Sequence, residues 1–383
     1  MSTDEPAPRA PVPPGKIRIG RIAGSDVLVS STWFVIAAII AFMVAPRVDQ
    51  VAPGLGPVKY LVGLLFAVAL YGAVLLHEAS HAVVASRYGF RVHSITLNFL
   101  GGATEIEGEA RRPRQEFWIA VVGPLTSLAV GGAALALWFI TPEGIPRLLV
   151  EGLAGANLLI GVLNLVPGLP LDGGRVLKAG VWAVTGKART GTLAAGWAGR
   201  GVAVLVLLWA VVLAQSGDTG QGYLSPLLAV IVGAFLWFGA SQALRAALVR
   251  DQVDQLRARE LARRTLAVPE DLPLAEALRR ADEVDAGSVV TVTPDGDPVG
   301  VVNEGAARAV PPERAPWVAV STVTRSLTSD ITLPATLEGT DLIRAIQHNP
   351  ASEYVLLDAD GTVCGVLSTV DVIRVVQSPR PGR

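Results

Sequence analysis

The sequence predicts a polytopic α-helical membrane protein with about six transmembrane helices, followed by a cytoplasmic α/β domain. Of its 383 residues, 51% are hydrophobic and only 17% are charged, whereas ordinary soluble domains have about a quarter charged residues. The apolar excess ends near residue 250, and the chain beyond it is far more polar. Such a change of composition within one chain indicates a membrane domain followed by a soluble domain.

The membrane domain is expected over residues 21–250. Residues 1–20 are expected to form a disordered tail, because they are rich in proline and polar groups and lack the apolar core of a signal peptide. Six apolar segments each approach the ~20 residues that a spanning helix needs. They cover residues 28–46, 58–85, 116–140, 148–166, 197–215 and 223–248.

The positions of lysine and arginine predict how these helices are oriented in the cell membrane. If the N-terminus is cytoplasmic, the inner segments up to Arg264 carry 20 lysines and arginines, and every inner segment contributes to that number. The outer segments then carry only three, Arg47, Lys59 and Arg147. We therefore expect a multi-pass protein with both termini in the cytoplasm.

Two histidines and a glutamate lie within the second apolar segment, YLVGLLFAVALYGAVLLHEASHAVVA, where ionisable groups are costly. His77 and His81 are four residues apart, so they share one helix face and can bind the same metal ion. Glu78 stands beside them as a general base would. The segment therefore predicts a zinc site within the membrane.

A catalytic zinc site usually has three protein ligands and a water molecule, so a third ligand is needed. His93 lies in a loop after the second segment, and His348 lies in the polar tail. Asp172 is the better candidate, because it follows the run NLVPGLP. Pro167 and Pro170 cannot continue a regular helix, and broken backbone at membrane depth occurs only where protein buries it or it lines a wet cavity.

The motif HEASH, followed much later by NLVPGLPLDGGR, resembles the site-2 protease family of intramembrane zinc metalloproteases, in its sporulation pro-sigma-factor-processing branch. The resemblance implies that His77, His81 and Asp172 hold one Zn²⁺. Glu78 would take a proton from the zinc-bound water and pass it to the leaving amine. Asn164 matches the family's asparagine and would donate a hydrogen bond to the substrate carbonyl or oxyanion; helix packing is the alternative role for Asn164.

Two further segments agree with this resemblance. Residues 94–108 carry β-type residues around Gly101 and Gly102, and in the family this region resembles a loop or hairpin to which an unwound substrate could add a strand. GPLTS in the third apolar segment also matches a family pattern, although Ser127 stands where relatives often have asparagine.

The polar tail contains an internal repeat with an offset of 65 residues. Residues 289–302 align without gaps on residues 354–367, and in both a strand meets an Asp-Gly hairpin turn and a second strand. An amphipathic helix precedes each hairpin. Residues 251–264 are charged and free of glycine and proline, and are expected to form a linker helix. Over residues 265–378 the repeat resembles a tandem cystathionine-β-synthase (CBS) domain pair.

The resemblance to CBS pairs implies an adenine nucleotide as ligand. The ribose-binding pattern is met in the second repeat by Gly365, Ser368 and Asp371, and a carboxylate suits ribose hydroxyls because it accepts two hydrogen bonds. The first repeat has Asn303 and Ala306 at the aligned positions, so at most one good nucleotide site is expected. A purely structural or dimerising module is the alternative, and a homodimer through the CBS domains is plausible.

Together these features predict an intramembrane zinc metalloprotease that hydrolyses a membrane-associated protein in regulated proteolysis, with the CBS pair as its regulatory module. The net charge of −1 gives no reason to expect a nucleic-acid partner, and the single cysteine, Cys364, excludes an internal disulfide. The rival interpretations are a CBS-gated metal-ion transporter and an inactive protease-like scaffold.

Overall fold

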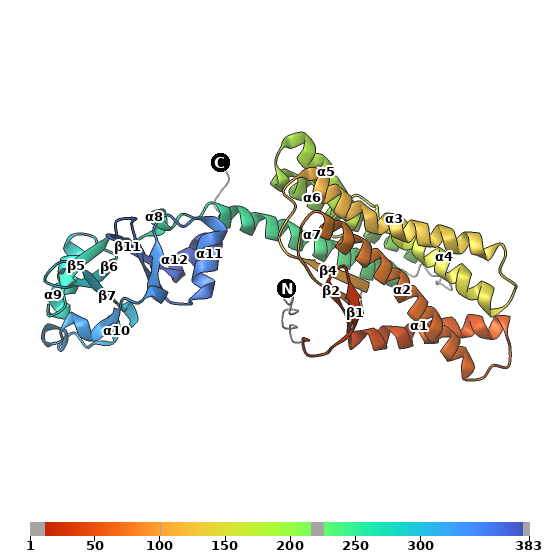
Figure 1. Cartoon of the computed structure of the whole chain (residues 1–383), viewed down its shortest axis with the longest axis horizontal. Helices are drawn as coiled ribbons and strands as arrows, with labels where there is room; N and C mark the ends of the chain where they lie inside the picture. Colours follow the sequence, from red (N-terminus) through yellow and green to blue (C-terminus); the bar gives the residue numbers. More distant parts are fainter. Residues whose placement is uncertain (1–11, 100, 216–225, 378–383) are drawn as a thin grey trace, which may run out of the picture. The chain divides into compact units, whose positions relative to one another are not determined.

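The structure, a computed structural model, describes residues 12–99, 101–215 and 226–377. It consists of two compact units, Met1–Arg245 and Ala246–Arg383, which we call the membrane unit and the C-terminal unit (Figure 1). Long helices dominate the first unit, and helices alternate with strands in the second. This arrangement confirms the predicted fold class.

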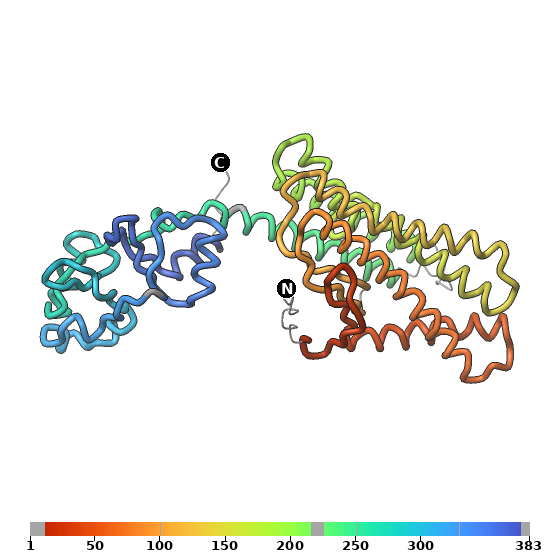
Figure 2. Tube along the Cα trace, viewed as in Figure 1, coloured from red at the N-terminus to blue at the C-terminus, as the bar shows by residue number. Residues whose placement is uncertain are grey.

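Six helices in the described part of the chain are long and apolar enough to cross a membrane. They are α1 (Thr32–Val51), α2 (Val58–Arg87), α3 (Pro113–Trp138), α4 (Ile145–Asn164), α6 (Ala188–Gln215) and α7 (Pro226–Asp254). Large apolar side chains stay exposed on them, as Leu205 and Phe238 show at 67% and 71% exposure. Apolar surface of this kind marks contact with a membrane, so the protein is a multi-pass membrane protein, as predicted. Figure 2 shows α3 and α4, which pack along each other.

A shorter helix, α5 (Asp172–Thr185), lies between α4 and α6 and was not among the predicted spans. It begins where the proline-interrupted run ends. A Cβ on Gly173 would lie 2.3 Å from the Val166 carbonyl oxygen, and a Cβ on Gly174 would lie 2.3 Å from the Leu169 nitrogen. The two glycines therefore let α5 start directly against the broken segment, with Asp172 as its first residue.

The membrane unit also contains a four-stranded sheet of order β1-β2-β3-β4. Its strands are β1 (Lys16–Ile22), β2 (Ser25–Ser30), β3 (Val92–Asn98) and β4 (Gly101–Ile106). The pair β3 and β4 is antiparallel, which confirms the hairpin expected within residues 94–108. β2 and β3 are parallel, so the N-terminal hairpin and the segment after α2 form one sheet.

The prediction of a disordered tail over residues 1–20 is wrong from Lys16 onwards; residues 1–11 lie outside the described residues. The segment KIRIGRI forms β1 because it pairs with β2 in antiparallel register. Arg18 and Arg21 both form salt bridges with Asp26 of β2, at 2.8 and 3.0 Å. Pairing with β2 thus orders this short basic strand. Such pairing could not be predicted from the composition of residues 1–20.

The prediction of one linker helix over residues 251–264 is also wrong. α7 ends at Asp254, and only the four residues of α8 (Ala258–Leu261) are helical after it. Leu256 and Ala258 are fully buried in the core of the second repeat, so tertiary packing overrides the helix propensity of this stretch. Arg263 then forms an isolated β-bridge with Val366.

The C-terminal unit contains the predicted duplication. The first repeat comprises β5 (Thr265–Pro269), α9 (Leu274–Glu283), β6 (Ser288–Val292), β7 (Pro298–Val302) and α10 (Glu304–Ala309), and β8 (Thr324–Ser326) completes its sheet. The second repeat comprises β9 (Thr332–Pro334), α11 (Gly339–His348), β10 (Glu353–Leu357), β11 (Val363–Ser368) and α12 (Thr369–Gln377). The short 3-10 helices Ala315–Trp317, Val320–Val323 and Ser329–Ile331 lie between them.

The predicted Asp-Gly turns close both hairpins, with Gly296 at φ +92° and Gly361 at φ +84°. Such positive φ values favour glycine. Val290 of the first repeat and Val355 of the second belong to one buried cluster. The two repeats therefore share a hydrophobic core and form one body.

Candidate metal centre

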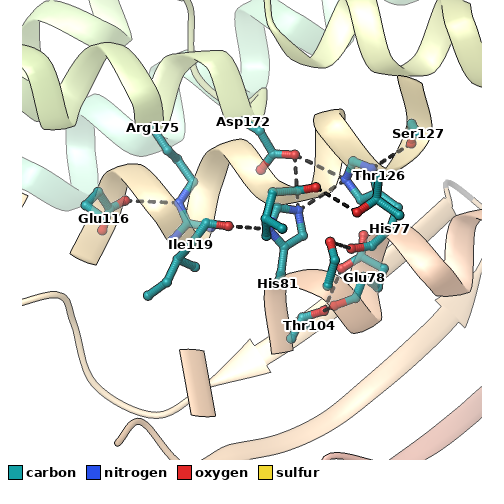
Figure 3. A network of polar contacts seen from close by, with 12 residues as sticks. His77, Glu78, His81, Thr104, Glu116, Ile119, Thr126, Ser127, Asp172 and Arg175 are labelled. Atoms are coloured by element: carbon teal, nitrogen blue, oxygen red, sulfur yellow. Dashed lines mark hydrogen bonds and ion pairs between the residues drawn. The ribbon is translucent and has the colours of Figure 1, made fainter. Parts of the chain in front are cut away.

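The three predicted metal ligands converge at one point inside the membrane unit (Figure 3). His77 and His81 extend from α2, and Asp172 extends from the first turn of α5. Asp172 Oδ2 lies 3.2 Å from His77 Nε2 and 3.3 Å from His81 Nε2, and the two Nε2 atoms are 3.2 Å apart. Two imidazole nitrogens and one carboxylate oxygen are a donor set of catalytic zinc, so the residues fit that ion.

The second nitrogen of each histidine is held by α3. His81 Nδ1 donates a hydrogen bond to the Ile119 carbonyl at 2.5 Å, and His77 Nδ1 lies 2.9 Å from Ser127 Oγ. With Nδ1 engaged in this way, Nε2 of each histidine faces the other two predicted ligands, an arrangement typical of metal-binding histidines. Ser127, whose role the sequence left open, therefore contacts a predicted ligand directly.

Gly123 of α3 provides the space for both imidazole rings. A Cβ at this position would lie 2.2 Å from His81 Nε2 and 2.7 Å from His77 Nε2. Real Cβ atoms do not approach other atoms so closely, so a larger residue would force the rings away from the metal position.

Glu78 lies next to His77 on α2 and is held by the β3–β4 hairpin (Figure 3). Thr104 Oγ1 donates to Glu78 Oε2 at 2.6 Å and lies 3.1 Å from the Glu78 carbonyl oxygen. A Cβ on Gly102 would lie 2.3 Å from Glu78 Cγ. The sequence reasoning missed Thr104. Its only signal was its place in the predicted hairpin, because a contact between a strand and a helix leaves no trace in sequence spacing.

The remaining predicted residues of the membrane unit take separate positions. Asn164 ends α4 and is half-buried, and its side-chain amide makes no hydrogen bond to another described residue. His93 lies on β3, where its Nε2 is 3.3 Å from Glu107 Oε2, so it is not part of the cluster. His348 ends α11 in the C-terminal unit.

The residues predicted to bind ribose contact the chain itself. Asp371 Oδ2 accepts a hydrogen bond from Arg263 Nε at 2.6 Å, and Arg263 also pairs with Glu304 of the first repeat. The hydrogen bond to Asp371 raises the pKa of the Arg263 guanidinium. A Cβ on Gly365 would lie 2.8 Å from the Arg263 carbonyl oxygen. Ser368 is buried at the end of β11.

A cavity of about 390 Å³ lies beside these ion pairs. It is lined by Arg263 and by residues of the first repeat, including Ser288, Glu304 and Arg308, and not by Gly365, Ser368 or Asp371. The open space is therefore next to the repeat whose ribose pattern is incomplete. The sequence pattern alone pointed to the other repeat.

Comparison with known proteins shows the family of this chain. The model of peptidase family M50 matches residues 65–154 and 143–208. "Putative zinc metalloprotease Rip3" of Mycobacterium tuberculosis is 32% identical over 372 residues, which cover 94% of this chain and 92% of that protein. The structure of a site-2 protease from Methanocaldococcus jannaschii is 25% identical, has a TM-score of 0.42, and covers 60% of this chain and 95% of its own.

The C-terminal unit is similar to the CBS domain of a bacterial CNNM/CorC family Mg²⁺ transporter, at 17% identity and a TM-score of 0.30, over 40% of this chain and 96% of that one. Six apolar helices in the described part of the chain, together with a His–His–Asp cluster whose two histidines are buried, are the features of a membrane-embedded zinc metalloprotease. The chain belongs to peptidase family M50 and is a zinc metalloprotease of the site-2 protease type.

Proposed function

We propose that this protease cleaves a membrane-associated protein in regulated proteolysis, with one zinc ion held by His77, His81 and Asp172. The convergence of these three side chains beside Glu78 carries the proposal. Zinc, when bound, supplies Lewis acidity that polarises the scissile carbonyl and makes a water molecule a good nucleophile at neutral pH.

Glu78 acts as the general base and then the general acid: it takes a proton from the attacking water and gives it to the leaving amine. The hydroxyl of Thr104 holds one carboxylate oxygen of Glu78 and fixes the orientation of the group. Asn164 has an amide that no other described residue engages, so it is free to donate a hydrogen bond to the developing oxyanion.

The substrate is bound as an extended strand along β4. Among the described strands β4 pairs only with β3 and is an edge of the sheet, so its outer backbone groups can accept another strand. Thr104 belongs to β4 and touches Glu78, so a peptide added there would run past the general base. An extended peptide exposes the scissile bond, which a helix would shield.

The first test does not require the substrate. Detergent-purified wild type should hold about one zinc per chain, and Asp172→Ala should lose it; a wild type that stays empty after zinc supplementation contradicts the proposed site.

Glu78→Gln should abolish cleavage of single-span reporter proteins in liposomes while zinc is retained. Glu107→Gln, directly after β4 and outside the metal cluster, is the matched control. A wild type that binds zinc but cleaves no reporter would favour the inactive scaffold.

Both termini are proposed to be cytoplasmic, because 20 of the lysines and arginines up to Arg264 then lie inside and three outside. Trp317 is 88% exposed in the C-terminal unit. In a Cys364→Ser background, Trp317→Cys should react with a membrane-impermeant maleimide in inside-out vesicles and not in intact cells. The reverse pattern contradicts this orientation.

The C-terminal unit is proposed to be a regulatory module that binds an adenine nucleotide and forms a homodimer. Asp371 and the adjoining cavity support the nucleotide, because they supply a ribose acceptor and a space of suitable size. Sedimentation of the full-length protein in detergent tests the dimer, and a monomer at all concentrations contradicts it.

A further inference from the structure

Ion pairs around one buried carboxylate join α3 to α5 close to the predicted metal centre. Glu116 of α3 is only 4% exposed. Its Oε1 lies 3.0 Å from Arg175 Nε (Figure 3). The same oxygen lies 3.5 Å from Lys178 Nζ, and both cations belong to α5. Burying charges costs several kcal/mol per ion even when they are paired, so the place of this cluster in the fold calls for an explanation.

The cluster fixes the helix turn that carries Asp172. Asp172 and Arg175 are three residues apart at the start of α5, so they lie on one helix face, one turn from each other. The segment before α5 contains Pro167 and Pro170 and forms no regular helix. The salt bridge between Arg175 and Glu116 therefore fixes the first turn of α5 against α3.

The same face of α3 supports the other two ligands. Glu116, Ile119, Gly123 and Ser127 are spaced by three, four and four residues, which places them on one stripe of the helix. Ile119 holds His81, Ser127 holds His77, and Gly123 leaves room for both rings. This helix face thus contacts two of the predicted ligands directly, and its Glu116 contacts the helix that carries the third, α5.

We propose that Glu116 is a positioning residue of the metal centre, which acts through Arg175 and Lys178 to hold Asp172 against the two histidines. This inference rests on the proposed zinc ligands. Residues outside the ligand shell that orient a ligand typically contribute 10- to 100-fold in metal affinity. A cluster that only stabilised the fold would leave the metal affinity of the folded protein unchanged.

The test is zinc affinity, measured by competition with a chromophoric chelator on full-length protein in detergent. Glu116→Gln keeps the shape of the side chain and removes its charge; we expect a rise in the zinc Kd of roughly 10- to 100-fold. The d–d absorption of the Co²⁺-substituted protein should change as well, because the carboxylate of Asp172 would be less well placed. Glu143→Gln removes an exposed Glu–Arg ion pair on another loop and should change neither readout.

A double-mutant cycle tests whether Glu116 acts through Arg175. If it does, Glu116→Gln combined with Arg175→Gln should weaken zinc binding little more than either single change. Fully additive losses would contradict this route. If Glu116→Gln does not fold, Lys178→Gln decides: a several-fold loss of affinity supports the proposal, and wild-type affinity overturns it.

Zinc binding by the wild type and by the variants distinguishes a failure of the role proposed for Glu116 from a failure of the proposed zinc ligands. A wild type that binds zinc, an Asp172→Ala variant that does not, and a Glu116→Gln variant with wild-type affinity and Co²⁺ spectrum would overturn only the role of Glu116. A wild type without tight zinc would overturn the proposed ligands.

Discussion

At the scale of single residues, the predicted metal centre depends on glycines that leave space as much as on the side chains that would bind the ion. His77 and His81 can approach each other because Gly123 carries no side chain, and Glu78 fits against the hairpin because Gly102 carries none. These glycines have no unusual backbone angle that would explain them. Each glycine instead leaves the space that the neighbouring side chains occupy.

Gly123→Ala should therefore remove tightly bound zinc. The new Cβ would lie 2.2 Å from His81 Nε2 and would displace the ring from the metal position. Gly132→Ala, on the same helix, is a matched control because its Cβ would meet nothing within 4 Å. Zinc content per folded chain measures the effect, and equal zinc in both variants would contradict it.

Thr104→Val should lower kcat and leave zinc content unchanged. The change removes the hydroxyl that donates to the Glu78 carboxylate while it keeps the shape of the side chain. A hydrogen bond to a charged group contributes about 1.5–3 kcal/mol, which corresponds to a loss of roughly 10- to 100-fold in rate. Thr104→Ser should restore most of the activity. Full activity in Thr104→Val would show that the hydroxyl does not orient the base.

At the scale of elements, the spanning helices could be predicted because each is a long apolar run. β1 could not, because it is short and basic and becomes a strand only through its pairing with Asp26 on β2. α5 was missed because it is short and carries charged residues, so it does not form a long apolar run. The linker was misjudged because Leu256 is buried by distant residues. Thr104 was missed because its partner lies in another element.

Within the second repeat, Glu353 gives β10 a distinct pH dependence. Burial, helped by the negative charge of Glu304, raises the pKa of the Glu353 carboxyl above its usual value. Between its usual unfolded pKa and this raised folded pKa, the folded state binds more protons, so this group stabilises the fold as pH falls through that range. At neutral pH its charge is a penalty.

Glu353→Gln should consequently raise the thermal midpoint of the C-terminal unit at pH 7 and lose this advantage as the pH approaches the usual pKa of a glutamate. Thermal unfolding of residues 246–383 over a pH series measures it. The exposed Glu313→Gln should show no such pH-dependent gain. A Glu353→Gln variant that is less stable than wild type at pH 7 would contradict the effect.

At the scale of the whole molecule, the chain joins a protease unit to a duplicated unit, and the relative from Mycobacterium tuberculosis matches over 94% of it. The repeat could be predicted because residues 289–302 align without gaps on residues 354–367. The contact between Arg263 and Asp371 could not, because it joins residues 108 positions apart. It changes the expectation for the ribose site, since the chain's own arginine engages the carboxylate.

A nucleotide that binds through Asp371 must therefore displace Arg263. Asp371→Ala should abolish most of the affinity for ATP or AMP in full-length protein, measured by titration calorimetry. Arg263→Gln should tighten binding by roughly two- to fivefold, because a partly exposed ion pair contributes at most about 1 kcal/mol. If Arg263→Gln instead weakens binding as much as Asp371→Ala, the arginine holds the nucleotide, and the cavity it lines in the first repeat is the binding site. If wild type binds neither nucleotide, the unit acts by association between chains.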